Sequence, residues 1–303
     1  MRGRLWAALI GTVLLLRGAG VLPDGREMEE LTLITALGLD GGEMVQVTAV
    51  TGIRQDQEAE VLTGTGMGPA SACRDMELSR PTRAYLGQTR QLLLGEKMAR
   101  ESLGEVMDFI LTDGSLRLDT LLYVVRGSAG AGLANSLELA SDGETAARRG
   151  RTVGELLSRL AESERVLIPA LAANGAGELN PAGWAVAGPN GVENFLDGDA
   201  AQGASLLLGL GEGDVVNFPE GAVELTRARC GAVGGVLRCR LDARVVEGDV
   251  DETMTELWAE RCIRAALVRG KDCWSLERMQ RLTGNVTPVQ KLTVKVVGSV
   301  RQE

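Results

Sequence analysis

Apolar residues alternate with polar ones, or recur at helical spacing, along most of the chain. Two runs rich in Val, Ile and Thr, near 30–39 and 43–52, flank Asp40-Gly41-Gly42, and this predicts a β-hairpin. Helical spacing predicts a helix at 97–111, with these apolar positions: Met98, Leu103, Val106, Met107 and Ile110. A strand is expected next, at 118–126. Strands and helices are therefore mixed in the first half of the chain.

The second half continues the mixture. Thr152 and Glu155 form a capping-box pattern that opens a helix, and a hairpin turn is expected at 189–191. From about 221 the pattern predicts two long strands, helices near 252–267 and 272–282, and a last strand with the sequence KLTVKVVGSV.

We therefore expect an α+β fold with three mixed α/β domains, at 23–150, 151–220 and 221–303, after an N-terminal segment at 1–22. The polar and then glycine-rich stretch before Pro69 is expected to be a loop. Its sequence GTGMGP only partly matches a dinucleotide-binding loop, because Pro69 stands where a glycine is needed.

The N-terminal segment resembles an export signal. Arg2 and Arg4 precede an apolar run at 5–16, and small residues follow at 18–20. The run is shorter than the ~20 residues that cross a bilayer, which favours cleavage near Gly20 over an uncleaved anchor. We expect the rest of the chain to be exported.

Charge and composition exclude several classes of function. The net charge is −9, and no cluster of basic residues is visible along the sequence, so no nucleic-acid partner is expected. The chain has no histidine, which excludes histidine-based nucleophilic pairs, histidine general bases and histidine metal sites. We expect no catalytic residues, no metal and no cofactor.

Acidic pairs are the main candidates for chemistry. Glu252 and Glu256 are four residues apart on an expected helix, where a general acid and base or a solvated face are the alternatives, and the solvated face is favoured. The same interpretation applies to the acidic residues at 101, 105 and 108. Trp258 and Trp274 are expected to anchor the core of the last domain.

The five cysteines do not all pair. Cys230 and Cys239 flank a hairpin that turns at Gly234-Gly235, and a two-residue turn would place them directly opposite each other. A cross-strand disulfide and two buried, unbonded thiols are both open, and the second is favoured.

One long stretch supplies a resemblance. The segment LGQTRQLLLGEKMARESLGEVMDFILTDGSLRLDTLLYVVRGSA, at 86–129, resembles the Ger(x)C family, the C subunits of spore germinant receptors. Two further segments follow the family pattern in order: REMEELTLITALGLD at 26–40 and GWAVAGPNGVENFLDGDAAQGASLLLG at 183–209.

The resemblance implies a non-enzymatic subunit that assembles with the membrane-embedded A and B subunits. It also implies a place on the outer face of the cytoplasmic membrane or inner spore membrane. Three positions depart from the family pattern: Leu22 stands where the family has a lipidated cysteine, Gln88 where histidine is common, and Thr112 where arginine is common. No lipid anchor is therefore expected at Leu22.

Within the resembling stretch, Glu96, Asp113 and Arg117 are candidate contacts with the partner subunits. Arg117 is expected to begin the next strand and to pair with Asp113 or Asp119. Two functions from other classes stay open: an exported hydrolase with paired carboxylates, and an envelope solute-binding protein with a cleft between domains.

Overall fold

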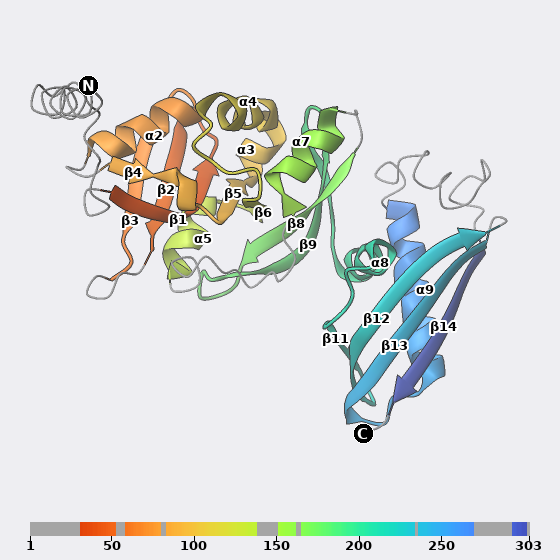
Figure 1. The fold of residues 1–303 in the computed structure, drawn as a ribbon. Coiled ribbons are helices and arrows are strands. Elements are labelled where there is room, and N and C mark those ends of the chain that lie inside the picture. Colours follow the sequence, from red (N-terminus) through yellow and green to blue (C-terminus); the bar gives the residue numbers. More distant parts are fainter. Residues whose placement is uncertain are drawn as a thin grey trace, which may run out of the picture.

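The computed structural model describes residues 31–52, 58–79, 83–137, 151–161, 165–233, 236–269 and 293–301. They form an α+β structure with two sheets, each covered by helices (Figure 1). The expected segment at 1–22 with Leu22, the expected helix at 272–282 with Trp274, and Cys273 all lie outside the described residues.

The larger sheet has 10 strands, and its main path runs β10-β9-β8-β6-β5-β1-β2-β3. In chain order its strands are β1 (Leu31–Asp40), β2 (Val45–Thr51), β3 (Val61–Gly66), β4 (Arg83–Tyr85), β5 (Gln91–Gly95), β6 (Leu121–Arg126), β7 (Arg151–Thr152), β8 (Val166–Ala173), β9 (Leu179–Gly188) and β10 (Gly191–Leu196). The two expected hairpins are confirmed, because β1 pairs antiparallel with β2 and β9 pairs antiparallel with β10.

Helices cover both faces of the larger sheet. They are α2 (Pro69–Leu78), the short 3-10 helix η2 (Leu86–Gln88), α3 (Glu96–Glu101), α4 (Leu103–Asp113), α5 (Ala129–Asn135) and α7 (Val153–Ala161). Alternate residues of the central strands face different helices: Leu92 and Leu94 join the core under α2, α3, α4 and α7, whereas Leu93 joins the core under α5. A parallel strand buried on both faces needs such a continuous apolar run.

The expected helix at 97–111 is two helices. The backbone leaves the helical region at Ser102, with φ −135° and ψ 24°, so α3 and α4 meet the sheet separately. The helix ends at Asp113, and Gly114 adopts the left-handed conformation with φ 65°. The next strand begins at Leu121, not at 118, so Arg117 lies in the connection between α4 and β6.

The stretch before Pro69 was expected to be a loop and contains the edge strand β3. Its buried positions are Leu62, Gly64 and Gly66, so two of the three carry no apolar side chain. Because glycines occupy these two buried positions, the sequence lacks the alternation of apolar and polar residues that would predict a strand. A Cβ on Gly64 would overlap the backbone of Ala72, which shows how closely α2 covers the strand.

The smaller sheet has four strands in the order β11-β12-β13-β14. They are β11 (Val215–Phe218), β12 (Gly221–Val233), β13 (Val236–Gly248) and β14 (Thr293–Arg301). The helices α8 (Gly198–Leu208) and α9 (Glu252–Arg269) pack against one face of this sheet and share its apolar core (Figure 1).

The boundaries at 150 and 220 that the sequence predicts can be placed on this topology. Along the sequence, position 150 comes after β6 and before β8. These two strands pair directly in the larger sheet, so strands from 31–196 form one continuous sheet. Residue 220 lies inside the smaller sheet, between β11 and β12.

Candidate functional site

The family-like segments of the first half meet at the end of β1. The Asp40 carboxylate accepts hydrogen bonds from Ser128 Oγ and from the backbone N–H groups of Ala129 and Gly130, each at 2.8 Å. Ser128 is the N-cap of α5. Asp40 thus occupies the N-terminus of this helix, where free N–H groups attract a carboxylate.

Gly95 completes this junction. A Cβ at this position would overlap Asp40 Oδ1, so only a glycine leaves room for the carboxylate. The next residue, Glu96, donates its backbone N–H to the carbonyl oxygen of Gly127 at 3.0 Å. We call Asp40, Gly95, Glu96, Gly127 and Ser128 the motif junction.

Arg100 forms an ion pair with Glu96 of the motif junction and also contacts β10. Arg100 Nε donates to Glu96 Oε1 at 2.9 Å, and Arg100 Nη1 donates to the carbonyl oxygens of Val192 and Glu193 in β10. The Arg100 guanidinium also lies 5.1 Å from the centre of the Phe195 ring, within cation–π range. Glu96, a candidate partner contact from the sequence, therefore orients an arginine that ties α3 to β10.

A cleft of about 620 Å³ opens beside this tie, where β8, β9 and α8 approach β11. Arg126 lines it, with its guanidinium 4.7 Å from the Phe195 ring centre. Its Nε and Nη2 atoms are buried and have no hydrogen-bond partner in the structure. A bound molecule would need an acceptor group facing these atoms.

The rest of the cleft lining is acidic and apolar. Asp197, Glu212 and Asp214 contribute carboxylates, and the Trp184 indole donates its N–H to Ser205 Oγ at 3.1 Å. Three carboxylates against one guanidinium disfavour a small anion. The lining suits a small polar molecule that carries both an acceptor and a cationic or donor group.

Asp197 connects the larger sheet to α9. It lies 2.6 Å from Arg269 Nη1 and 3.6 Å from Arg126 Nη1. The hydrogen bond from Arg269 is the largest cause that holds the pKa of the Asp197 carboxyl below its usual value. A second pair, Arg261 with Asp199 at 2.8 Å, joins α9 to the start of α8.

The other two candidate contacts lie at the end of α4 (Asp113) and within the α4–β6 connection (Arg117). Asp113 accepts hydrogen bonds from Ser115 at the end of α4. Arg117 forms a bidentate pair with Asp119, with N–O distances of 2.8 and 2.6 Å, and this pair raises the pKa of Arg117 and lowers that of Asp119. Of the two acids expected as partners of Arg117, the structure selects Asp119.

A second hollow, of about 500 Å³, brings Arg117 and Asp119 beside Gln88. Two positions singled out by the family pattern, Gln88 and Arg117, therefore share one surface. Glu96 belongs to the motif junction and does not line this hollow. The three candidate contacts therefore do not form one cluster, and none of them lines the cleft beside Arg126.

The carboxylate pairs are not arranged for acid–base catalysis. Glu256 Oε1 accepts the backbone N–H of Gly298 at 2.7 Å, and Glu252 Oε1 accepts that of Val300 at 3.4 Å. Glu252 is exposed, as the expected solvated face requires, whereas Glu256 is half-buried, and both residues hold β14 against α9. The acidic residues at 101, 105 and 108 are exposed, as a solvated face requires.

Trp258 packs against the apolar core that the four-stranded sheet shares with α8 and α9. It is partly buried and meets Phe218 edge to face, with 6.2 Å between ring centres. This is the anchoring role that the sequence predicts for it.

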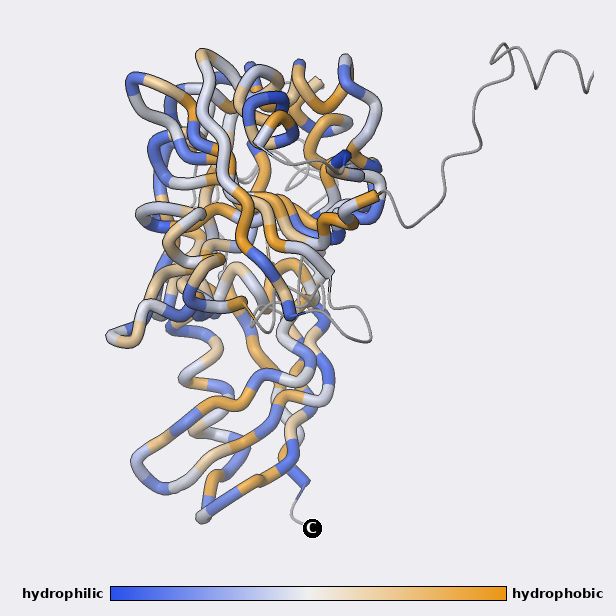
Figure 2. The backbone as a smooth tube through the Cα atoms, turned by 90° about the vertical axis from the view of Figure 1, so that its left-hand side faces the viewer, coloured by the Kyte–Doolittle hydropathy of each residue, from blue (hydrophilic) through white to orange (hydrophobic). Residues whose placement is uncertain are grey.

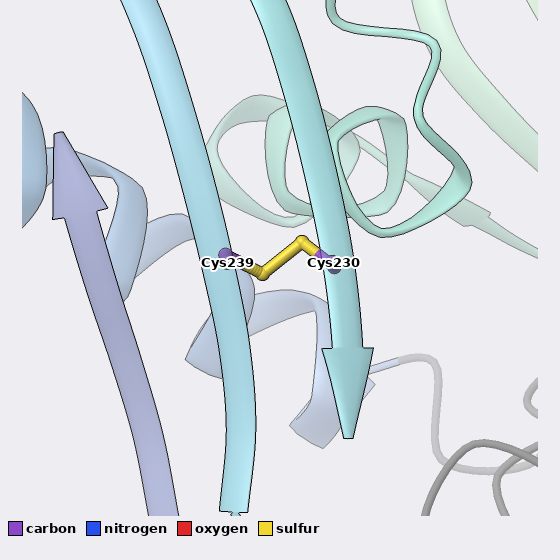
Figure 3. Close-up of a disulfide and its surroundings, with 2 residues drawn as sticks. All are labelled: Cys230 and Cys239. Atoms are coloured by element: carbon purple, nitrogen blue, oxygen red, sulfur yellow. A yellow bond between two sulfur atoms is a disulfide. The ribbon is translucent and has the colours of Figure 1, made fainter. Parts of the chain in front are cut away.

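Cys230 and Cys239 form a disulfide (Figure 3). The predicted register is confirmed, because the two residues are direct partners on β12 and β13 with a Cα–Cα distance of 4.1 Å. The favoured interpretation of two unbonded thiols is wrong. A pair without backbone hydrogen bonds brings its side chains together, which is the geometry a cross-strand disulfide uses.

The two free cysteines in the described ranges are buried. Burial raises the pKa of the Cys73 thiol to about 12, and burial with the nearby Asp199 carboxylate raises that of Cys262 to about 12. Neither is a nucleophile at neutral pH. Across the described residues, no group of three or more Cys, Asp or Glu side chains is placed to hold a metal ion.

Comparison with known proteins finds similarity to spore germination proteins in both sequence and fold. Residues 24–145, which include the whole motif junction, match the family model of the spore germination protein N-terminal domain. Among solved structures, the crystal structure of the GerBC protein is similar, with a TM-score of 0.51 at 15% sequence identity, covering 88% of this chain and 96% of that chain. None of the curated proteins compared with the sequence matches it.

Residues 24–145 are thus similar to the N-terminal domain of spore germination proteins, which agrees with the resemblance to the Ger(x)C family that the sequence indicates. The similarity to GerBC shows that the two proteins share a mixed α+β fold. Among the described residues, every helix is too short or too polar to cross a membrane.

Proposed function

We propose that this protein is the C subunit of a spore germinant receptor and assembles with the membrane-embedded A and B subunits. The observation that carries the proposal is the family match over 24–145, in which the family-like segments meet at one motif junction. The junction orders the N-terminus of α5 and, through Glu96 and Arg100, the position of β10. Its chemistry is structural, as a scaffold subunit requires.

The proposed role is not enzymatic. The chain has no histidine, its two free described thiols have raised pKa values, and Glu252 and Glu256 bind the backbone of β14. These observations support a protein that acts by binding. They give no support to the alternative of a hydrolase with paired carboxylates.

The proposed location is the outer face of the inner spore membrane. The Cys230–Cys239 disulfide supports this location, because such bonds persist in oxidising surroundings outside the cytosol. Since Leu22 has no thiol for lipidation, we propose that contacts with the A and B subunits retain the protein after cleavage near Gly20. Asp113 at the end of α4, Arg117 on the exposed α4–β6 connection, and Glu96 are proposed as contact residues.

Purification from spore membranes tests the assembly. We expect an affinity-tagged chain, expressed from its own locus, to recover the A and B subunits after mild detergent extraction. Deleting the chain should abolish dipicolinate release in response to the nutrient that this receptor senses. Recovery of the chain without either subunit, together with normal release in the deletion strain, would refute the proposal.

A charge reversal tests the contact residues. Arg117→Glu should reduce recovery of the A and B subunits, whereas Arg83→Glu, at another exposed arginine, should not. Equal recovery with both variants at equal protein level would exclude Arg117 from the interface and leave the assembly itself intact.

A further inference from the structure

Hydrophilic and hydrophobic residues alternate along the strands of the four-stranded sheet (Figure 2). On β13 the side chains at 237, 239, 241 and 243 are buried in the core shared with α8 and α9. Because side chains alternate along a strand, the intervening residues point to the opposite face. The described helices that pack on this sheet, α8 and α9, leave that outer face open (Figure 1).

The outer face is strongly basic. Its cations come from all three long strands: Arg227, Arg229, Arg238, Arg240, Arg244, Lys295 and Arg301. We call these seven residues the basic face. Three carboxylates, Glu224, Asp242 and Glu247, share the surface, so its formal charge is +4. The whole chain carries −9, and the rest of it therefore carries −13.

The register places like charges directly beside one another. Arg229 is the partner of Arg240, Arg238 of Lys295, and Arg244 of Arg301. Neighbouring strands are only about 4.8 Å apart, and like charges in direct opposition destabilise a sheet. This arrangement has an energetic cost in the isolated protein, and an anionic partner would remove it.

Two of these seven cations form ion pairs with carboxylates of the described residues. Arg244 pairs with Glu224 at 2.6 Å, and Arg240, whose side chain is 77% exposed, lies 3.8 Å from Asp242. No carboxylate of the described residues forms an ion pair with Arg227, Arg229 or Arg238. Their charges are available to a partner.

The wide spacing of the cations favours binding to an extended surface over binding to a single small ligand. The cations are spread over three adjacent strands, and Val297, which is 61% exposed, lies among them beside Arg240. The face carries no aromatic side chain on which a nucleic-acid base could stack. A broad cationic face with an exposed apolar residue between the charges suits the headgroup layer of an anionic bilayer.

We propose that the basic face docks on the surface of a membrane rich in anionic phospholipid. The arginines and Lys295 would bind lipid phosphates, and Val297 would contact the headgroup layer. The acidic remainder of the chain would be repelled by the same surface, so the protein would settle with the basic face towards the lipid. The proposal rests on the charge distribution and does not depend on the A and B subunits.

Vesicle flotation with the purified full chain tests this docking. We expect binding to phosphatidylcholine vesicles that contain about 30% phosphatidylglycerol, no binding to phosphatidylcholine alone, and release as salt rises from about 50 to 300 mM. The triple variant Arg229→Gln, Arg238→Gln and Arg240→Gln should bind more than about tenfold more weakly. Thermal unfolding of the variant should be unchanged or shifted upwards, because like-charge repulsion is relieved.

A matched triple variant removes three exposed cations from the larger sheet and its helices: Arg74→Gln, Arg83→Gln and Lys97→Gln. It should bind as the wild type does. Equal loss in both triple variants would mean that net charge alone governs binding, and unchanged binding in the first would exclude the basic face; either overturns the proposal.

A competition experiment distinguishes anionic lipid from other polyanions as the partner of the basic face. Duplex DNA and polyglutamate, at matched charge concentration, should displace the protein from vesicles only weakly. Stronger binding to polyglutamate would assign the face to an acidic protein segment, and stronger binding to DNA would assign it to nucleic acid; both outcomes refute membrane docking. If the triple variant does not fold, the single variant Arg238→Gln gives the same test at smaller amplitude.

Discussion

The motif junction makes a quantitative prediction about stability. Asp40→Ala removes three hydrogen bonds of 2.8 Å from a carboxylate and leaves two N–H groups at the start of α5 without that acceptor. Hydrogen bonds to a charged group contribute about 1.5–3 kcal/mol each when buried, and loss of a helix cap costs about 0.5–2 kcal/mol. Since Asp40 is partly solvent-accessible, we expect a total loss of about 3 kcal/mol in the free energy of unfolding.

Gly95→Ala should cost nearly as much, for a linked reason. The new Cβ would overlap Asp40 Oδ1 and displace the carboxylate from α5. We expect a loss of about 2–3 kcal/mol, since the same hydrogen bonds are lost. In the Asp40→Ala background the overlap with the carboxylate disappears and only the 3.1 Å approach to the Gly127 carbonyl oxygen remains, so Gly95→Ala should change stability by less than about 0.5 kcal/mol, because alanine also restricts the unfolded chain.

The measurement is a double-mutant cycle by urea unfolding, followed by circular dichroism. The expected coupling energy is about 2 kcal/mol or more, far above the few tenths that independent sites show. Gly104→Ala is the control, because a Cβ there meets no atom within 4 Å, and it should not couple to Asp40. Additive effects of Asp40→Ala and Gly95→Ala would refute the reasoning.

Two further predictions concern the smaller sheet and the helices that pack on it. Replacing Cys230 and Cys239 by serine opens a loop with a sequence separation of 9, so stability should fall by about 2–3 kcal/mol; equal urea midpoints for the oxidised wild type and the variant would contradict this. Asp197 has a lowered pKa, so its pair with Arg269 stabilises the protein above the ordinary carboxyl range near pH 4, and this is lost as the pH falls through the folded-state value. Asp197→Asn should therefore remove less than about 1 kcal/mol at pH 7, because the pair is half exposed, and the difference between variant and wild type should vanish in strong acid.

Local patterns in the sequence determine much of the fold. The hairpins β1–β2 and β9–β10 and the register that opposes Cys230 to Cys239 are predicted correctly. The capping box is also confirmed, since Glu155 donates its N–H to Thr152 Oγ1 and Thr152 donates its own to Glu155. Turn and cap chemistry depends on neighbouring residues, so it can be read along the chain.

Contacts between distant residues are decided only by the tertiary structure. Asp40 is 88 residues from Ser128, and Glu256 is 42 residues from Gly298, so their hydrogen bonds leave no local signature. A carboxylate on a helix has the same sequence pattern whether it meets water or a strand, so the hydrogen bonds that Glu252 and Glu256 accept from β14 could not be predicted. The continuity of the larger sheet past residue 150 likewise depends on the parallel pairing of β6 with β8.

The basic face shows the same division. Its seven cations are distributed between 227 and 301, among many acidic residues, and the sequence shows no cluster. The alternation of side chains along β12, β13 and β14, combined with the pairing register, brings them to one surface. The alternation of hydrophobic residues determined that each strand has a polar side. Only the strand order decided that the polar sides of three adjacent strands form one positively charged surface.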